Sequence, residues 1–279
     1  MEKLISADLT NNKLCIFEYT TTDGQMLSFK EDAFDAKIVS HTYTDIGKVI
    51  FDKPITRIGD KAFDWCTSLT SVTIPDSATT IGRSAFAICC SLTSVTIPDS
   101  VTTIGEGAFN SCHSLTSVTI PNSVTTIGDS AFEYCYSLKE FKGKFAADGG
   151  RCLIMDGVLN AFAIGCGVTQ YTIPDSVTTI GKCAFSGCES LTSVTIPDSV
   201  TTIRWGTFED CTSLTSVTIG KGVSEIGTDA FKDCNIDTIV CCPKIPPKIN
   251  DSFDRFENLI VTTGCEEAYA NSDWGKYLE

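Results

Sequence analysis

The sequence predicts a solenoid in which short strands of successive turns stack into parallel sheets. The stretch SLTSVTIPDSVTTIG recurs almost unchanged from Ser91, Ser114 and Ser190, and in altered form from Ser213. One phenylalanine per copy follows a spacing of 23 residues, at Phe63, Phe86, Phe109 and Phe132 and again at Phe185, Phe208 and Phe231. No helical or strand period persists through the whole unit, so one turn with several short edges explains it better than a single element.

Each unit is expected to have three edges. Leu115–Ile120 alternates apolar and hydroxyl residues and is rich in β-branched side chains, which predicts a short strand with one wet face. Pro121 should end it because proline cannot donate to a ladder. Val124–Gly128 predicts a second extended edge with a glycine corner. Asp129–Cys135 predicts an irregular or single-turn edge that carries phenylalanine and cysteine inward.

The ends of the array are atypical, as the caps of a stacked fold should be. Residues 1–45 are predicted to form an N-terminal cap with a β-hairpin around Asp23–Gly24. Residues 46–249 form the solenoid, and 250–279 a helical C-terminal cap. An insertion at about 143–163 contains Asp156–Gly157, which predicts a small hairpin projecting from the wall. Nine stacked parallel strands are expected to begin at Ile46, Leu69, Leu92, Leu115, Leu138, Val168, Leu191, Leu214 and Ile236.

Charge and hydropathy narrow the class of partner. The chain of 279 residues carries a formal charge of -14, which argues against nucleic acid and anionic membranes and favours a basic or neutral partner. No apolar run approaches the roughly 18 residues needed to span a bilayer. The opening residues, Met1–Asp8, lack the apolar core of a secretion signal, so a cytoplasmic location is possible. A monomer is expected.

Seven cysteines occupy one position of the repeat, three residues after the phenylalanine: Cys66, Cys89, Cys112, Cys135, Cys188, Cys211 and Cys234. Equivalent side chains in a stack point in parallel, which is poor geometry for disulfides, so a column of buried free thiols is predicted. The neighbouring pairs Cys89–Cys90 and Cys241–Cys242 could bind soft metals as vicinal thiols. The absence of recurring C-x-x-C pairs disfavours a metal site, and no cofactor is expected.

Catalysis is not expected. Only His41 and His113 could serve as imidazole bases, and neither lies in a local catalytic pattern. The aspartates after proline occur at one turn position in several copies, whereas a catalytic group is needed only once. Outward Ser-x-Thr pairs, such as Ser117 and Thr119, either offer a hydroxyl surface to a ligand or are ordinary solvated strand residues.

Departures from the repeat suggest a contact zone. The positions directly before and after the column cysteine should point outward, and large amphipathic residues gather there in the first four copies. The fourth copy also replaces a Thr-Ser pair with Lys139-Glu140. Tolerated surface drift remains an alternative explanation. The predicted contact zone comprises Trp65, Ile88, His113, Tyr134, Tyr136, Lys139, Glu140 and Lys142.

The repeat pattern resembles a known family. The residues Leu92, Val95, Ile97, Pro98, Val101, Ile104, Gly105, Ala108, Phe109 and Cys112 carry the motif L-x-x-V-x-I-P-x-x-V-x-x-I-G-x-x-A-F-x-x-C, which is similar to the leucine-rich repeats of BspA-like surface proteins of bacteria and protozoa. The closing stretch, with Tyr269, Trp274 and Tyr277, resembles the terminal cap of such proteins from Bacteroides-like gut anaerobes. The resemblance implies a leucine-rich repeat solenoid, coiled to the right and curved, with a parallel sheet on its concave face.

For function, the resemblance implies adhesion or protein binding, without catalysis, by a protein that is at the cell surface or secreted. Two hypotheses follow. The first is a recognition scaffold for a protein or glycan, and the second is a structural spacer in a larger surface assembly. A spacer predicts featureless outward positions in every copy, whereas a binder predicts a local cluster.

Overall fold

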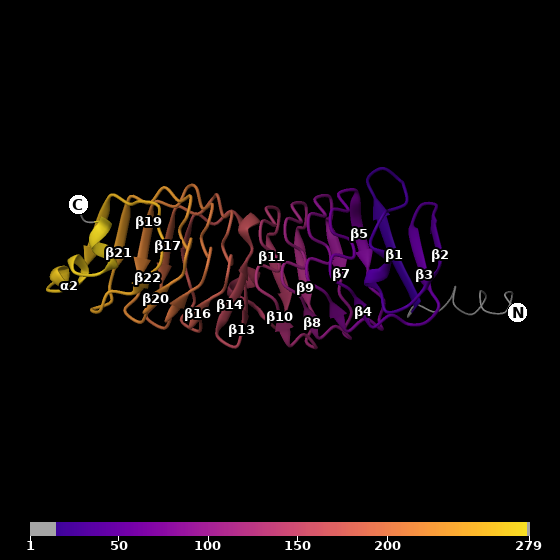
Figure 1. Ribbon diagram of the computed structural model, residues 1–279, viewed down its shortest axis with the longest axis horizontal. Helices are drawn as coiled ribbons and strands as arrows, with labels where there is room; N and C mark the ends of the chain where they lie inside the picture. The colour runs from indigo at the N-terminus through magenta and orange to yellow at the C-terminus, as the bar shows by residue number, and fades with distance from the viewer. Residues whose placement is uncertain (1–14, 278–279) are drawn as a thin grey trace, which may run out of the picture. The chain divides into compact units, whose positions relative to one another are not determined.

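The computed structural model describes residues 15–277, and the chain divides into two compact units, one ending at Ala146 and the other beginning at Ala147 (Figure 1). Each unit is described separately. The expectation about Met1–Asp8 lies outside the described residues. None of the helices in the described part is long and apolar enough to cross a membrane.

Each turn of unit 1 has the three expected edges. The first edge contributes β5 (Leu69–Thr73), β7 (Ser94–Thr96), β9 (Ser117–Ile120) and β11 (Glu140–Gly143). The second contributes β4 (Arg57–Ile58), β6 (Thr80–Ile81), β8 (Thr103–Ile104) and β10 (Thr126–Ile127). Paired strands are parallel and one repeat apart, as Val72 is with Val95, and the first-edge sheet is interrupted between β7 and β9. The third edge has no strands, but backbone bonds such as Phe86 N–H to Ala108 O (2.8 Å) link its turns.

The N-terminal cap differs from the sequence prediction. The chain bends at Asp23–Gly24 without forming a second strand, and the hairpin consists of β2 (Ile38–Tyr43) and β3 (Gly47–Phe51). Strand β1 (Ile16–Thr21) lies between β3 and β5 and is antiparallel to both, so the strand expected from Ile46 is not stacked on β5. A single turn of 3-10 helix, η2 (Glu31–Ala33), precedes the hairpin. The reason is core closure, since β1 stacks Phe17 on Phe63 (4.7 Å) at the end of the column.

Unit 2 repeats the same turn. Its first-edge strands are β15 (Gln170–Thr172), β17 (Ser193–Ile196), β19 (Ser216–Ile219), β21 (Thr238–Cys241) and β23 (Asn258–Val261). Its second-edge sheet contains β13 (Cys152–Met155), β14 (Val158–Phe162), β16 (Thr179–Ile180), β18 (Thr202–Ile203), β20 (Glu225–Ile226) and β22 (Lys248–Ile249). The short β12 (Ala146–Ala147) lies at the boundary of the units, and η3 (Asp148–Gly150) and η4 (Ile164–Cys166) are single 3-10 turns.

The predicted hairpin at Asp156–Gly157 is present but does not project. Strands β13 and β14 pair antiparallel across that turn, and β14 then pairs in parallel with β16, so the hairpin is part of the sheet. The reason is that VLNAF, residues 158–162, is a degenerate copy of the second edge. Phe162 consequently joins the phenylalanine column and stacks on Phe185 at 4.5 Å.

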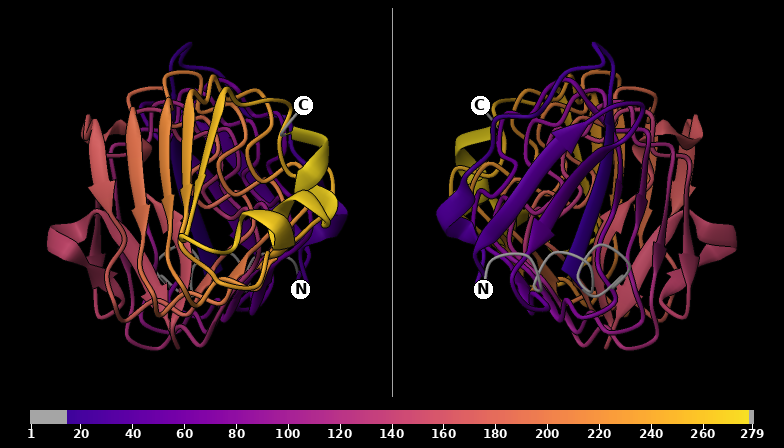
Figure 2. Two further views of the ribbon diagram at one scale, coloured as in Figure 1. Left: turned by 90° about the vertical axis from the view of Figure 1, so that its left-hand side faces the viewer. Right: turned by 90° about the vertical axis from the view of Figure 1, so that its right-hand side faces the viewer.

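The C-terminal cap combines a strand with the expected helical closure. Strand β23 extends the first-edge sheet, and α2 (Glu266–Ala270) and η5 (Asp273–Tyr277) follow it, in yellow in Figure 2. Tyr269 and Trp274 are completely buried. The Tyr269 hydroxyl donates to Pro243 O and the Trp274 indole N–H donates to Pro247 O, each at 2.8 Å, so both polar tips are satisfied.

A column of phenylalanine rings forms the centre of each unit. In unit 1, Phe63, Phe86, Phe109 and Phe132 stack at 5.1 to 5.5 Å with interplanar angles of 3° to 5°. In unit 2, Phe185, Phe208 and Phe231 continue from Phe162 at 4.8 and 5.0 Å. Each ring is buried by the turns on either side, so one turn cannot complete its own core.

Candidate partner-binding surface

The residue before each column cysteine, here called the pre-cysteine position, has a left-handed backbone in every regular turn. In unit 1 the φ angles are 65° at Trp65, 58° at Ile88, 58° at Ser111 and 56° at Tyr134. In unit 2 they are 74° at Gly187, 59° at Asp210 and 56° at Asp233. The third edge therefore imposes this conformation whatever residue stands there.

The two units fill this position with different residues. Glycine adopts positive φ freely and aspartate tolerates it, whereas each bulky L-residue costs about 1–2 kcal/mol there. Tryptophan, β-branched isoleucine and tyrosine are therefore poor choices for folding at this position. Unit 1 carries three of them, and unit 2 carries none at its three equivalent positions.

The bulky residues gain little burial in return. Trp65 is 68% exposed, and Ile88 and Tyr134 are only partly buried. Tyr136, which follows the column cysteine of the fourth copy, is 43% exposed. Burial in the core therefore does not offset the conformational free energy that these residues cost. Strained residues of this kind are typical of functional sites.

Three aromatic side chains of the contact zone form a compact group. The rings of His113 and Tyr136 are 5.2 Å apart between centroids, and those of Tyr134 and Tyr136 are 6.0 Å apart. Trp65 occupies the same row as Tyr134 but three turns away, roughly 14 Å at the spacing of adjacent strands. The structure thus brings together His113, Tyr134 and Tyr136, which we call the aromatic trio, and leaves Trp65 apart.

The charged members of the contact zone lie at or on β11. Glu140 pairs with Ser117 and Lys142 with Thr119 of β9, so the two charges replace the hydroxyl pair of the preceding turn. Lys142 Nζ lies 2.8 Å from Glu140 Oε1, with both side chains about half exposed. Lys139 is exposed at the start of the strand. In the chain, these three charged residues follow Tyr136 of the aromatic trio within six residues.

The column cysteines are buried and unpaired in disulfides, as the sequence predicts. Several thiols donate to the carbonyl of the preceding turn's column phenylalanine, for example Cys112 to Phe86 O and Cys135 to Phe109 O, both at 3.2 Å. Burial raises the pKa of Cys135 and of Cys188 to about 12. The column is therefore built for packing and inter-turn hydrogen bonding, and not for thiolate chemistry.

His41 also has a structural role. Its Nε2 lies 2.6 Å from the Tyr19 hydroxyl, and burial lowers its pKa. The serine and threonine residues of β5 and β7 form rows along the sheet. Ser71 lies beside Ser94 and Thr73 beside Thr96, as expected for the Ser-x-Thr pairs of the repeat.

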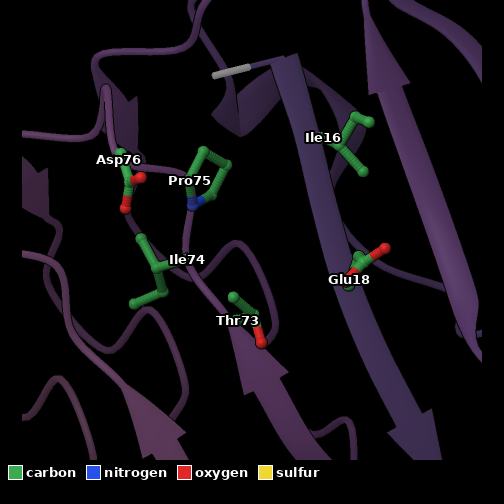
Figure 3. Close-up of a pocket in the computed structure, with 6 residues that line it drawn as sticks. All are labelled: Ile16, Glu18, Thr73, Ile74, Pro75 and Asp76. Carbon is green, nitrogen blue, oxygen red and sulfur yellow. The ribbon is translucent and has the colours of Figure 1, made fainter. Parts of the chain in front are cut away.

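A pocket of about 210 Å³ lies where β1 and the chain after β5 separate. Figure 3 shows Ile16 and Glu18 on β1 beside the segment Thr73–Asp76. Glu18 Oε1 is 2.9 Å from Lys48 Nζ, so this carboxylate already has a cation. The pocket is smaller than ordinary small-molecule sites. The pocket could not be predicted from the sequence because it depends on the long-range pairing of β1 with β5.

Solved structures of bacterial proteins resemble this chain. A leucine-rich cell surface protein from Faecalibacterium prausnitzii is 29% identical with a TM-score of 0.56, and the match covers 74% of this chain and 64% of that one. A leucine-rich repeat protein from Eubacterium ventriosum is 24% identical with a TM-score of 0.57, covering 73% and 64%. The pneumococcal vaccine antigen PcpA, 17% identical with a TM-score of 0.52, covers 74% and 65%.

This chain thus spans less than two thirds of the length of those proteins. No curated protein matches it. The family model described as "BspA type leucine-rich repeat region" matches this chain in six copies. The matches cover residues 37–146 and 159–260, which is well over half of the sequence. Together with turns of 23 residues and parallel sheets in each unit, this match shows that the chain belongs to the BspA-type leucine-rich repeat family.

Proposed function

We propose that the chain is a non-enzymatic recognition module that binds a protein or glycan partner through the contact zone of unit 1. The observation that carries the proposal is the row of bulky residues that are held in a left-handed backbone without being buried in the core, with Trp65 exposed and Ile88 and Tyr134 partly buried. Trp65, Ile88 and Tyr134 each cost folding free energy where glycine or aspartate serves in unit 2. A side chain that is costly for folding and exposed to solvent fits a role in contact with another molecule.

The chemistry of the zone suits recognition. Exposed aromatic rings supply large contact area with little loss of side-chain entropy, and rings with a polar tip work well at half-wet surfaces. The aromatic trio presents one imidazole and two phenol rings together. Lys139 and the Glu140–Lys142 pair provide charges at its border, where they would orient a partner more than add affinity.

The location proposed for this function is the cell surface. The Faecalibacterium prausnitzii protein is described as a cell surface protein. The formal charge of -14 agrees with a basic or neutral partner and would repel strongly anionic ones.

The test is capture of partners from immobilised host-matrix proteins and mucin glycans, with the parent chain beside a variant carrying Trp65→Ala, Tyr134→Ala and Tyr136→Ala. The parent is expected to bind a partner, and the variant to bind it at least about 30-fold more weakly, as for loss of interface hot spots. Circular dichroism and thermal unfolding establish that the variant is folded. Equal binding by both would place the partner elsewhere.

A matched control is available in unit 2. Trp205 is 42% exposed, and its indole N–H donates to Asp229 Oδ2 at 3.3 Å. Trp205→Ala also removes an exposed tryptophan from the solenoid, but from another position of the repeat. It should leave binding unchanged if the contact zone holds the partner.

The alternative is a structural spacer in a larger surface assembly. The uniform hydroxyl rows favour it, since Ser193 and Thr195 of β17 align with Ser216 and Thr218 of β19 without variation. A spacer has no partner of its own. Failure of the parent chain to bind any protein or glycan tested would favour it.

A further inference from the structure

The N-terminal cap has an unusual free edge. Strand β2 is the outermost strand of its sheet, in the order β2-β3-β1-β5-β7, and among residues 15–277 it pairs only with β3. Its sequence, IVSHTY, contains no charged residue and no proline, and it is rich in residues that favour strands. Natural edge strands are commonly protected by lysine, proline, bulges or a covering segment.

Exposed apolar side chains gather at this edge. Val39 on β2 is 52% exposed, and Ile46, in the turn between β2 and β3, is 43% exposed. The register with β3 shifts between Ile38 and Ser40, so Val39 is an extra residue in the strand. Such a bulge disfavours unlimited edge-to-edge growth, but it leaves Ser40–Tyr43 as a regular open edge.

Two opposite charges flank the strand. Lys37 precedes β2 and Asp45 follows it, and both are exposed. The backbone N–H of Lys37 donates to Asp52 Oδ1 at 2.9 Å, but neither charged group forms an ion pair within the described residues. The strand thus has an uncharged centre with an unpaired cation at one end and an unpaired anion at the other.

This arrangement is complementary to itself. When two copies of β2 run antiparallel with His41 opposite His41, Ser40 of each copy lies opposite Thr42 of the other, and hydroxyl pairs stabilise antiparallel strands. The same arrangement brings the end of β2 that carries Lys37 in each copy beside the end that carries Asp45 in the other. The imidazole of His41 is already engaged with Tyr19 of its own copy, 2.6 Å from the hydroxyl.

We propose that β2 is a self-association edge, through which two copies of this chain pair by antiparallel β-augmentation centred on His41. The contact is two-fold symmetric, so each copy uses the same edge and two copies joined through β2 close as a dimer. This departs from the monomer expected from the sequence. Pairing would join two contact zones in one particle, and binding to a surface with many partners would gain by avidity.

The test uses charge exchange at exposed positions of the full chain, followed by sedimentation velocity over a concentration series. The variants Lys37→Glu and Asp45→Lys each place like charges together at both ends of the pair. Each is expected to weaken dimerisation about tenfold, as two attractive exposed pairs become repulsive. An equimolar mixture of the two variants, or both changes in one chain, restores complementary charges and should recover the parent affinity within about threefold.

A matched control separates this effect from local charge. Lys53 lines the same acidic hollow of the cap as Lys37 but follows β3 and does not flank β2, so Lys53→Glu should leave the dimer unchanged. Thermal unfolding of each variant confirms that the cap is folded. Restoration in the mixture would establish the register. The proposal would be overturned if the parent chain stayed monomeric up to about 1 mM. It would also be overturned if the charge exchanges did not weaken the dimer, or if the mixture did not restore it.

Discussion

The two units have nearly the same buried core but different residues on their surfaces. Both have a stacked phenylalanine column and a column of buried thiols. At the pre-cysteine position, however, unit 2 uses Gly187, Asp210 and Asp233, which suit the left-handed backbone, whereas unit 1 uses three bulky residues that do not. The interior residues of the two units are therefore explained by folding alone. The residues at the pre-cysteine position of unit 1 are not, and they call for a role outside folding.

The largest effect is expected in thiol reactivity, which should be equally low inside both units. Cys135 in unit 1 and Cys188 in unit 2 both have a pKa raised to about 12 by burial. Because the thiolate is the reactive species, these thiols should react with iodoacetamide at pH 8 about a thousandfold more slowly than an ordinary cysteine. Mass spectrometry of the labelled chain measures this. Faster labelling of either column would show that its unit opens readily.

The partly exposed cysteines provide the internal reference for that experiment. They are Cys90, Cys166, Cys242 and Cys265. Labelling should begin at these four and reach the column only in denaturant.

The second prediction concerns the phenylalanine columns. Phe109→Ala in unit 1 and Phe208→Ala in unit 2 each remove a fully buried ring with a stacked neighbour on both sides, and each should cost about 3–5 kcal/mol of stability. Hydrogen exchange should show loss of protection concentrated in the mutated unit. Equal loss across both units would mean that they unfold as one body.

The third prediction exchanges the exterior residues. Tyr134→Gly in unit 1 relieves a strained tyrosine and should change stability by no more than about 1 kcal/mol in the stabilising direction, while weakening partner binding. Asp210→Ile in unit 2 should destabilise by about 1–2 kcal/mol. Chemical denaturation measures both. If Tyr134→Gly destabilised strongly, the tyrosine would be structural, and the argument for display would fail.

The smallest effect is expected at the charged border of the contact zone. Glu140→Gln breaks an exposed ion pair with Lys142 and should alter stability by less than about 0.5 kcal/mol. If the border orients a partner, the association rate and its salt dependence should change more than stability does. Surface plasmon resonance at two ionic strengths would distinguish these effects.

The regular turns could be predicted from the sequence because every cue was local and repeated. Pro121, Gly128 and the alternation in Leu115–Ile120 define three edges that the structure contains. The caps could not be predicted in detail, because the antiparallel insertion of β1 between β3 and β5 is a long-range pairing that no local pattern encodes. The hairpin at Asp156–Gly157 could be predicted from its turn residues. Its place in the sheet could not, because residues 158–162, VLNAF, differ so much from the other second-edge strands.

The contact zone shows a similar limit. Sequence comparison of the copies singled out the pre-cysteine position by its large residues, yet the left-handed backbone was not anticipated there. Glycine and aspartate in unit 2 were the available clue, since both are enriched at positive φ. The left-handed backbone could not be inferred from unit 1, because bulky residues such as Trp65, Ile88 and Tyr134 ordinarily argue against this conformation.

The thiol-to-carbonyl bonds have a consequence for how such a chain can change its length over generations. Cys89 donates to Phe63 O, and Cys112 to Phe86 O, with the same offset of 26 residues, which is one copy of 23 residues plus the offset of three from phenylalanine to cysteine. A duplication or deletion of one whole 23-residue copy therefore regenerates every donor and acceptor at the new junction. An insertion of another length changes this offset in the turn where it falls. Copying errors that add or remove a whole turn are therefore the ones that keep every thiol-to-carbonyl bond, and they change the length of the solenoid in steps of one turn.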